Sequence, residues 1–206
     1  NQKGINFVHS SIKNISPTTR YYCASSSEQF GTNNNIPAGG FNEQSEFKPA
    51  SPYAIGKVAA HNLVQLYRKS YNLHASCGIL FNHESEIRSE TFVTRKITRA
   101  AAKIKLGLQD KLILGNLNAF RDWGWAADFC DGIWLMLQQE NPDDYVLATG
   151  EPHSVLEFAS FVFEYADLDL QKYLAVNSKY CRPCEVPYLK GDYSKAFRTF
   201  GWEPTV

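Results

Sequence analysis

Two kinds of hydrophobic segment alternate along the chain. One is a short continuous apolar run, and the other is a longer stripe of apolar residues at helical spacing. The short runs are typical of buried strands, and they predict strands at 21–26, 74–82, 111–116, 144–150 and near 173–177. The stripes predict helices at 51–72, about 91–107, 124–140, 154–166 and 193–200. Strands that alternate with helices favour an α/β fold with a parallel sheet.

The helix predicted at 51–72 has the clearest start. Ser51 suits the N-cap, and Pro52 suits the first helical position because its missing N–H costs no hydrogen bond there. The apolar stripe that we expect to face the core consists of Ile55, Val58, Ala59, Leu63, Leu66 and Tyr67. The preceding stretch, 31–50, is rich in Gly, Asn and Pro and predicts a long loop, of the kind that often forms a functional lid.

Composition is that of an ordinary soluble globular protein, since 44% of the 206 residues are hydrophobic and 20% are charged. Basic and acidic residues balance at 21 each, so no overall field attracts nucleic acid or an anionic membrane. No apolar run approaches the ~20 residues that span a bilayer, and we expect no signal peptide. We therefore expect neither nucleic acid nor a membrane as a partner.

The five cysteines indicate a reducing, cytoplasmic setting. Cys23, Cys77 and Cys130 lie in apolar runs, where a reduced cysteine packs as a small hydrophobe. Cys181 and Cys184 have CxxC spacing, but zinc takes about four ligands and the sequence has no second such pair. We therefore expect no metal site.

Two pairs of residues are candidates for chemistry. Tyr53 and Lys57 are four positions apart at the start of a predicted helix, so they lie on one face. An ammonium beside a phenol favours the phenolate, which can accept the proton of a sugar hydroxyl. Ser26 and Glu28 follow a predicted strand at its carboxyl end, where ligands bind in open α/β sheets. Alternatively, the tyrosine packs, the lysine is solvated, and Glu28 is an ordinary loop residue.

Longer motifs accompany these pairs. They are LFNHES at 80–85, ETFVTRK at 90–96, LGN at 114–116, RDWG at 121–124, RPCEV at 182–186 and GWEP at 201–204. With the SSSE segment and the YxxxK helix, they make the chain resemble the GDP-mannose 4,6-dehydratase family of extended short-chain dehydrogenase/reductases from about Arg20 onward. The resemblance implies the C-terminal part of a Rossmann-type parallel sheet with a small α/β substrate-binding subdomain.

The resemblance also implies a division of the chain. Residues 1–150 would form a partial Rossmann-like catalytic domain, with substrate-binding segments near 82–125. Residues 151–206 would form mainly a C-terminal subdomain that binds the sugar nucleotide. The intact enzyme would be a homo-oligomer, either a dimer or a tetramer.

A defined mechanism follows from the resemblance. Tyr53 would deprotonate the C4 hydroxyl of GDP-mannose while hydride passes to NADP, and Lys57 would support the tyrosine and hold the nicotinamide ribose. Ser26 would bond the same hydroxyl. Glu28 would then take the C5 proton, which the new ketone acidifies, so that the C6 hydroxyl leaves as water and the hydride returns to C6.

Other positions match ligand contacts of the family. His83 and Arg88 match cofactor contacts. The cradle of the GDP group would consist of Asn82, Val93, Lys96, Arg121, Arg182 and Glu185. Arginine suits a pyrophosphate through its bidentate fork, and a glutamate accepts hydrogen bonds from ribose or guanine. Read singly, Lys96 and its neighbours would be a solvated helix face, and Arg121 with Asp122 a structural ion pair.

Some positions depart from the family pattern. The run Glu86-Ile87-Arg88-Ser89 stands where the family has Pro-Arg-Arg-Gly, and Trp125 stands where a histidine is usual. No glycine-rich GxxGxxG or GxGxxG turn occurs in the sequence. We therefore expect this chain alone to bind NADP weakly or not at all and to show no turnover. We also expect one edge and both faces of its sheet to be uncovered.

Two functional interpretations stay open. The first is the catalytic and sugar-nucleotide half of a GDP-mannose 4,6-dehydratase, with reductases, dehydratases or epimerases of other nucleotide sugars as alternatives within the same class. Glu28 distinguishes a dehydratase from a simple epimerase, which needs no elimination base. The second is a non-catalytic remnant that binds GDP-sugars or pairs with a full-length homologue.

Overall fold

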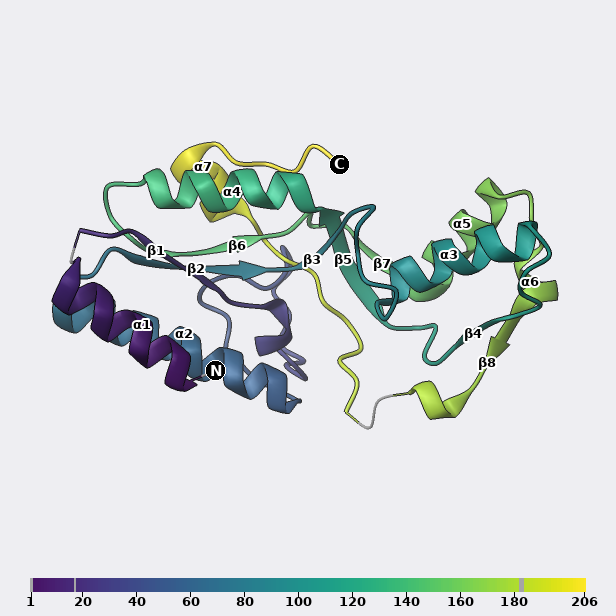
Figure 1. Ribbon diagram of the computed structural model, residues 1–206, viewed down its shortest axis with the longest axis horizontal. Helices are drawn as coiled ribbons and strands as arrows, with labels where there is room; N and C mark the ends of the chain where they lie inside the picture. The colour runs from purple at the N-terminus through teal and green to yellow at the C-terminus, as the bar shows by residue number, and fades with distance from the viewer. Residues whose placement is uncertain (1, 17, 182–183) are drawn as a thin grey trace.

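The computed structural model describes residues 2–16, 18–181 and 184–206. The molecule is elongated, with a sheet lobe at one end and a distal lobe at the other (Figure 1). The sheet lobe is built on three parallel strands in the order β1-β2-β6, which are β1 (Tyr21–Ala24), β2 (Ala75–Leu80) and β6 (Asp144–Leu147). The register places Cys23 beside Cys77, and Cys77 beside Asp144. A parallel α/β architecture was predicted, and it is confirmed.

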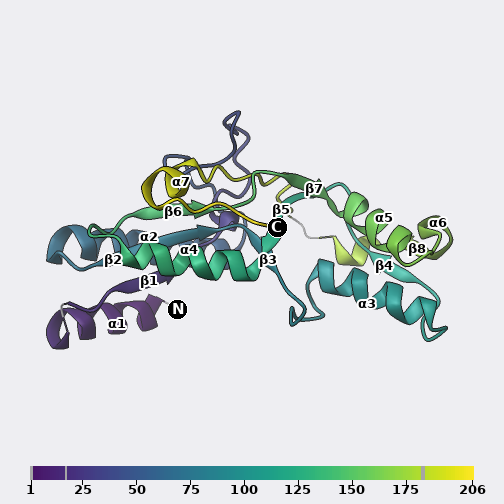
Figure 2. The same ribbon diagram turned by 90° about the horizontal axis from the view of Figure 1, so that it is seen from above.

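Helices cover both faces of this sheet. Helices α1 (Gln2–Ile15) and α2 (Pro52–Tyr71) lie side by side on one face, whereas α4 (Ala126–Gln138) and α7 (Ser194–Phe200) lie on the other (Figures 1 and 2). The prediction that both faces are uncovered is therefore wrong, because the chain supplies its own cover. Both edges of this sheet lack a further strand among the described residues, since β1 and β6 each pair only with β2.

The distal lobe has a smaller core of its own. Helices α3 (Val93–Lys105), α5 (Val155–Tyr165) and α6 (Leu170–Tyr173) enclose it with the parallel pair of β4 (Leu112–Leu114) and β8 (Leu174–Val176). Its fully buried side chains include Ile97, Leu112 and Phe163. The short 3-10 helix η2 (Ser178–Tyr180) follows β8.

A second three-stranded sheet joins the two lobes. Its order is β3-β5-β7, formed by β3 (Asn82–Glu84), β5 (Phe120–Trp125) and β7 (Pro152–Ser154). Asp122, on β5, is fully buried. Its carboxylate accepts hydrogen bonds from the backbone N–H groups of Thr149, Gly150 and Gly191 at 2.8–3.0 Å and from the Thr149 hydroxyl at 2.7 Å. One carboxylate thus ties the joining strand to two segments of the sheet lobe.

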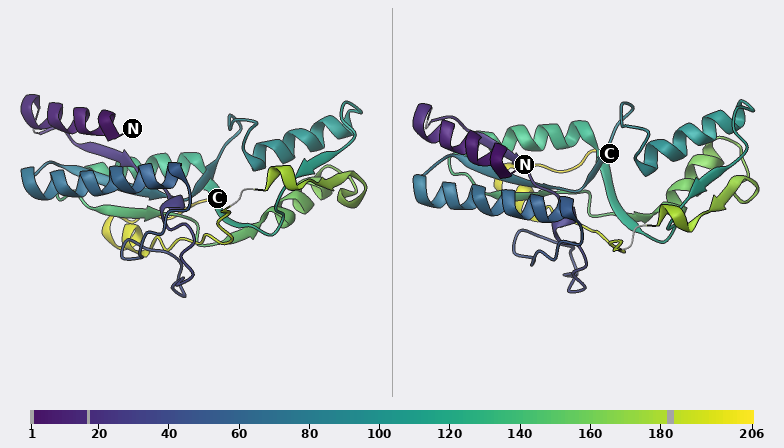
Figure 3. Two further views of the ribbon diagram at one scale, coloured as in Figure 1. Left: turned by 90° about the horizontal axis from the view of Figure 1, so that it is seen from below. Right: turned by 60° about the horizontal axis from the view of Figure 1, so that its bottom comes forward.

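The long loop at 31–50 is irregular, as predicted, but it is anchored rather than loose. Phe41 is fully buried and stacks on Phe30 with ring centroids 4.6 Å apart. Its backbone N–H donates to the Lys190 carbonyl at 2.8 Å, and Asp192 N donates to the Phe41 carbonyl at 2.9 Å. Figure 3 shows the loop beside the segment that leads into α7. The centre of the loop is therefore part of the core.

Several predicted boundaries are wrong. The strand predicted at 74–82 ends at Leu80, and β3 begins at residue 82 after a break. The helix predicted from 124 begins at Ala126 because residues 120–125 form β5. No helix was predicted before residue 21, where α1 lies, and β7 and α6 were also missed. Cys23 and Cys77 are buried as expected, whereas Cys130 is exposed.

The buried face of α2 differs from the predicted stripe. The helix buries Ala54, Ala60, His61 and Val64. Ile55 and Leu66, two of the large apolar residues in the predicted stripe, are 58% and 54% exposed. The helix is therefore turned so that a histidine, rather than these aliphatic side chains, faces the sheet.

Candidate active site

Helix α2 presents Tyr53 and Lys57 at the carboxyl end of the sheet strands. Ser51 caps the helix by accepting a hydrogen bond from Ala54 N at 3.1 Å, with Pro52 at the first position, as the sequence predicted. Lys57 Nζ donates to the Ala24 carbonyl, the last of β1, at 2.7 Å. The same ammonium lies 5.6 Å from the centroid of the Tyr53 ring. Lys57 therefore links the helix start, the phenol and the strand end.

Ser26 and Glu28 lie in a tight turn directly after β1. The turn is the 3-10 helix η1 (Ser27–Gln29), and Ser26 is its N-cap. Ser26 Oγ accepts from Glu28 N at 3.3 Å, and the Gln29 side chain accepts from Ser26 N at 2.9 Å. Ser26 and Gln29 form a capping box, in which the Ser26 side chain accepts from the Gln29 backbone and the Gln29 side chain accepts from the Ser26 backbone, and this box fixes the turn at the strand end. Helix α2 packs against this turn, so the four predicted catalytic residues lie in one region.

The reactive groups of this region are available to a ligand. Tyr53 is 57% exposed and Glu28 is half-buried. The Tyr53 hydroxyl and the Glu28 carboxylate make no hydrogen bond or ion pair with any residue that the structure describes. A phenol, an ammonium, a hydroxyl and a carboxylate at one sheet end can support proton transfers to and from a bound alcohol.

The residues predicted to contact a cofactor follow β2. His83 Nδ1 donates to the Phe81 carbonyl at 2.8 Å, since a carbonyl can only accept, and its ring stacks on Phe129. Its Nε2 is thereby left to face a ligand. Arg88 is less free, because its Nε approaches Glu84 Oε2 at 3.2 Å and its guanidinium lies 3.5 Å over the Phe92 ring.

The Arg88 Nε approach to Glu84 is an ion pair without hydrogen-bond alignment, since this buried nitrogen has no hydrogen-bond partner. Glu84 also accepts a hydrogen bond from the Thr94 hydroxyl at 2.6 Å. Glu84 therefore links Arg88 to the start of α3. An arginine held in this way has less freedom to reach a phosphate.

The predicted substrate-binding residues lie along the joining sheet and α3. Asn82 is on β3, and Val93 is the first residue of α3. Lys96 Nζ lies 4.4 Å over the Tyr180 ring, so α3 contacts the segment that precedes residue 182. Arg121 donates from one guanidinium nitrogen to the carbonyls of Phe120 and Val186 at 2.8 and 2.9 Å.

The Arg121 bond to the Val186 carbonyl brings β5 beside Glu185, which is half-buried. Arg182 lies outside the described residues. The alternative interpretation of Asp122 as an ion-pair partner of Arg121 is not needed, because backbone N–H groups and Thr149 already occupy both oxygens of its carboxylate.

Sequence analysis missed a group of buried polar residues beneath this site. His61 on α2 contacts Ser25, and Asp144 at the start of β6 contacts Gln65 and Arg68 of the same helix. The available signal was the spacing of His61, Gln65 and Arg68, which repeats at three to four residues inside an apolar stripe.

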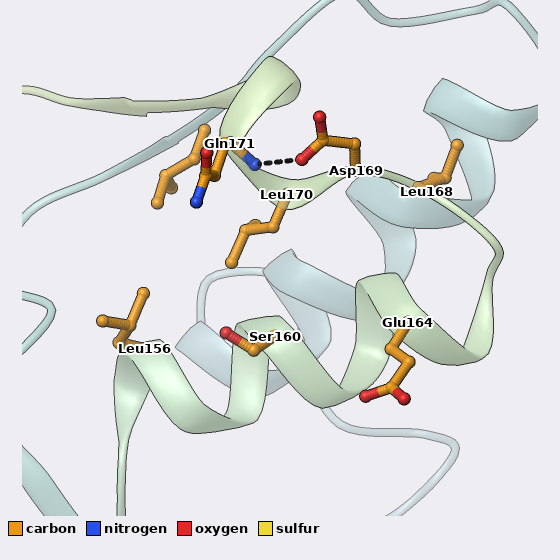
Figure 4. A pocket seen from close by; sticks show the side chains of 8 residues that line it. Leu156, Ser160, Glu164, Leu168, Asp169, Leu170 and Gln171 are labelled. Atoms are coloured by element: carbon orange, nitrogen blue, oxygen red, sulfur yellow. Dashed lines mark hydrogen bonds between the residues drawn. The ribbon is translucent and has the colours of Figure 1, made fainter.

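A cavity of about 500 Å³ lies in the distal lobe, away from Tyr53 and Lys57. Figure 4 shows that α5 and the start of α6 line it, with Leu156, Ser160 and Leu170 around the opening. The Asp169 carboxylate beside it is satisfied locally by Gln171 N at 2.9 Å. None of the predicted site residues lines this cavity. Its lining combines four leucines with the carboxylates of Glu164 and Asp169 and with Ser160 and Gln171, and we assign it no role.

No helix among the described residues combines the length and the apolar character needed to cross a bilayer.

The chain is similar to known proteins over most of its length. The family profile described as GDP-mannose 4,6 dehydratase matches residues 5–206. GDP-mannose 4,6 dehydratase 2 of Arabidopsis thaliana is 53% identical over 189 residues, which are 92% of this chain and 50% of that protein. GDP-mannose 4,6-dehydratase of Sinorhizobium fredii is 48% identical and matches 89% of this chain and 56% of that protein. The chain spans about half the length of the curated relatives that it matches.

Solved structures give the same fold at low sequence identity. A dTDP-glucose 4,6-dehydratase of Bacillus anthracis in complex with NAD has a TM-score of 0.86 at 18% identity, over 98% of this chain and 62% of that one. RMD of Pseudomonas aeruginosa complexed with NADPH also has a TM-score of 0.86, at 20% identity, over 99% of this chain and 67% of that one. These likenesses confirm the Rossmann-type α/β fold. Together with the profile match and the identity to curated relatives, they show that this chain belongs to the GDP-mannose 4,6-dehydratase family.

Proposed function

We propose that the protein containing this chain dehydrates GDP-mannose to GDP-4-keto-6-deoxymannose. The observation that carries the proposal is the position of Lys57, which bonds the last carbonyl of β1 at 2.7 Å while its ammonium lies 5.6 Å from the centre of the Tyr53 ring. This contact holds the start of α2 beside the turn that contains Ser26 and Glu28. The family membership of the chain supports the same reaction class.

Each of these residues has a distinct role in the proposal. The Tyr53 phenolate takes the proton of the C4 hydroxyl and becomes a phenol, and the Lys57 ammonium stabilises the phenolate form that accepts the proton. Ser26 hydrogen-bonds the same hydroxyl. Glu28 removes the proton at C5, which is acidic only after C4 has become a ketone. The electron pair from the C5–H bond then forms the C5–C6 double bond as the C6 hydroxyl leaves with a proton as water.

NADP is the proposed cofactor, and when bound it supplies the acceptor for the C4 hydride and the donor of that hydride to C6. The residues present fit a nicotinamide cofactor in part. The Tyr53 hydroxyl is exposed, the Lys57 ammonium keeps two N–H groups beyond its bond to Ala24 for the ribose, and His83 Nε2 can accept a hydrogen bond. Arg88 fits less well, because Glu84 and Phe92 hold its guanidinium.

We also propose that the GDP group lies along the joining sheet, where Asn82, Val93, Lys96, Arg121 and Glu185 come from neighbouring elements. The hydrogen bonds from Arg121 to two carbonyls support this role, because they fix the orientation of its planar guanidinium group. Arg182 belongs to the same proposal through its position in the sequence. A cytoplasmic setting, a homo-oligomeric state and a sugar-nucleotide subdomain within 151–206 are further parts of the proposal.

Two variants of the protein encoded by the complete reading frame that contains this chain test the function. Tyr53→Phe should abolish oxidation at C4, because no group then accepts the hydroxyl proton. Glu28→Gln should permit oxidation yet stall dehydration, so that a GDP-4-keto-hexose retaining its C6 hydroxyl accumulates and is detected by mass spectrometry. Glu46→Gln, at an exposed loop position, is the matched control and should keep full turnover. If both site variants lose only thermal stability, the catalytic assignment fails.

A second candidate is a non-catalytic protein that binds GDP-sugars or pairs with a homologue. The ion pair between Arg88 and Glu84 favours it, because that arginine is less available to a cofactor phosphate. Calorimetric titration distinguishes the two candidates. Binding of GDP-mannose by the complete protein without any binding of NADP would favour the non-catalytic candidate.

A further inference from the structure

A buried hydrogen-bond chain connects α2 with the turn that contains Ser26 and Glu28. His61 is 2% exposed, and its Nδ1 lies 2.9 Å from Ser25 Oγ. Ser25 Oγ donates its one proton to Gln29 Oε1. The hydroxyl can therefore only accept from the imidazole, so the ring proton of His61 must be on Nδ1.

The other ring nitrogen of His61 completes the chain on the opposite side. His61 Nε2 lies 3.1 Å from the Gln65 amide nitrogen, which donates to it because Nε2 of this tautomer is an acceptor. The same Gln65 amide donates to Asp144 Oδ2 at 2.7 Å, and Arg68 bonds Asp144 Oδ1. From Gln65 the hydrogen bonds run in one direction, through His61 and Ser25 to Gln29, whereas the Asp144 carboxylate accepts from both Gln65 and Arg68.

The end of this chain is the turn itself. Gln29 Oε1 receives the Ser25 hydroxyl and also the backbone N–H of Ser26 at 2.9 Å. Gln29 is fully buried, so its carbonyl oxygen has no water to replace these bonds. The orientation of the turn therefore depends on a hydrogen bond that starts on the helix with Tyr53 and Lys57.

Two other functions for these residues are disfavoured. His61, Cys77 and Asp144 place possible metal-ligand atoms within 4.8 Å of one another. However, Arg68 already neutralises Asp144, and burial raises the pKa of the Cys77 thiol well above its usual value, which disfavours the thiolate that metals bind. Ser25, His61 and Asp144 resemble a hydrolytic triad, but Ser25 is 5% exposed and its proton points to Gln29 rather than to His61.

We propose that His61 is a positioning residue for the dehydration proposed above. It holds Ser25, and through Gln29 it sets Ser26 and Glu28 at the distance from Tyr53 that proton transfer requires. This inference rests on the proposed function. Misplacement of reacting groups by ~1 Å can cost about 100-fold in rate, so the bond is expected to affect turnover more than binding.

Two substitutions distinguish the roles of the two ring nitrogens of His61. Both are made in the protein encoded by the complete reading frame. His61→Asn places an amide N–H near the position of Nδ1 and keeps the donation to Ser25. His61→Gln places its amide near Nε2 and loses that donation. Both variants lose the edge-on contact of the imidazole with Phe47, so they are matched in lost packing.

The expected result is a separation of kcat from KM. His61→Gln should lower kcat about 10- to 100-fold with KM for GDP-mannose unchanged, whereas His61→Asn should stay within about threefold of the unaltered protein. His74→Gln is a control, since the His74 imidazole is half-buried and bonds the Gln139 carbonyl at 2.8 Å, away from Ser25 and Gln29. Equal losses of kcat in both His61 variants, or a change confined to KM, would overturn the proposal.

Amide hydrogen exchange tests the same bond without substrate. The backbone N–H groups of residues 26–30 should exchange faster in His61→Gln than in His61→Asn, because the turn is released from α2. Unchanged exchange in His61→Gln would contradict the holding role. If the unaltered protein does not convert GDP-mannose, the proposed function fails, and this exchange result still decides whether His61 holds the turn.

Discussion

Lys57 donates a hydrogen bond to the carbonyl of Ala24 at 2.7 Å, across 33 positions of the chain. The bond joins the first turn of α2 to the last residue of β1. The bond places the ammonium between the phenol of Tyr53 and the serine-rich turn. In the sequence, only their shared motifs associated these two groups. A lysine at this point therefore has both a structural and a chemical function.

Removal of this ammonium should affect activity strongly. Lys57→Met keeps most of the apolar stem but loses the bond to Ala24 and the positive charge beside Tyr53. We expect kcat of the complete protein to fall about 100-fold or more, as for loss of a group that assists proton transfer. Lys69→Met, at an exposed position in the last turn of the same helix, should leave kcat unchanged. Equal kcat values for the two variants would contradict the assignment.

Substitution of Asp122 should lower the stability of the fold, and we do not expect its carboxylate to bind a ligand. Asp122→Asn replaces one acceptor oxygen by an NH2 group that faces backbone donors of Thr149, Gly150 or Gly191. We expect the free energy of unfolding to fall by about 2–3 kcal/mol, since hydrogen bonds to a buried charge are lost and donors are left unpaired. Urea unfolding followed by circular dichroism measures this. Asp131→Asn on the exposed side of α4 should change it little.

Two glycines should respond to alanine in opposite directions. At Gly191 an added Cβ would meet Ala148 Cβ at 2.3 Å and the Phe81 ring at 2.8 Å, so Gly191→Ala should destabilise the fold by about 1–3 kcal/mol. At Gly56, within α2, nothing lies within 4 Å of the added atom. Gly56→Ala should therefore stabilise the fold by about 0.5–1 kcal/mol through helix propensity. Thermal unfolding of both variants would refute this account if their melting temperatures moved the same way.

Stability should depend on acid pH through Asp144. Burial alone raises the pKa of Asp144, but the hydrogen bond and the charge of Arg68, with the His61 imidazole beside the carboxylate, outweigh it and hold the pKa well below its usual value. The ionised form is therefore favoured in the folded state. Its contribution to stability is complete above the unfolded pKa of about 3.9 and is lost as the pH falls toward the lower folded value.

The pH profile of Asp144→Asn checks this sign. The difference in unfolding free energy between the unaltered protein and Asp144→Asn should be constant above about pH 5 and should narrow as the pH falls toward about 2. Asp110→Asn, at an exposed position, should give a profile parallel to that of the unaltered protein. A difference that widens in acid would show that the carboxyl is not held ionised.

Local patterns predicted the fold where neighbours in sequence decide the structure. The N-cap at Ser51, the buried run of β2 and the alternation of strands and helices follow from cap chemistry and apolar periodicity. The strands β3 and β7 could not be found in this way, because each has three residues and exists only by pairing with β5. A pattern of three residues has no period to detect.

The candidate site was only partly accessible to such reasoning. The Tyr53–Lys57 face follows from helical spacing, and the position of Ser26 after a strand follows from the apolar run. The orientation of α2 did not follow, because hydrophobicity favours Ile55 at the core whereas the structure buries His61. A histidine with hydrogen bonds on both ring nitrogens takes the place of aliphatic packing there. A hydrophobicity scale assigns one value to each residue and therefore does not include such hydrogen-bond partners.

The order in which the chain builds its two lobes limits how the gene can be rearranged. Residues 75–80, 126–147 and 194–200 belong to the sheet lobe, whereas 93–114 and 155–176 belong to the distal lobe. No single crossover in the coding sequence could exchange one lobe for that of another protein while leaving the other whole. A single crossover within this region would therefore leave both lobes as mixtures of the two parent proteins.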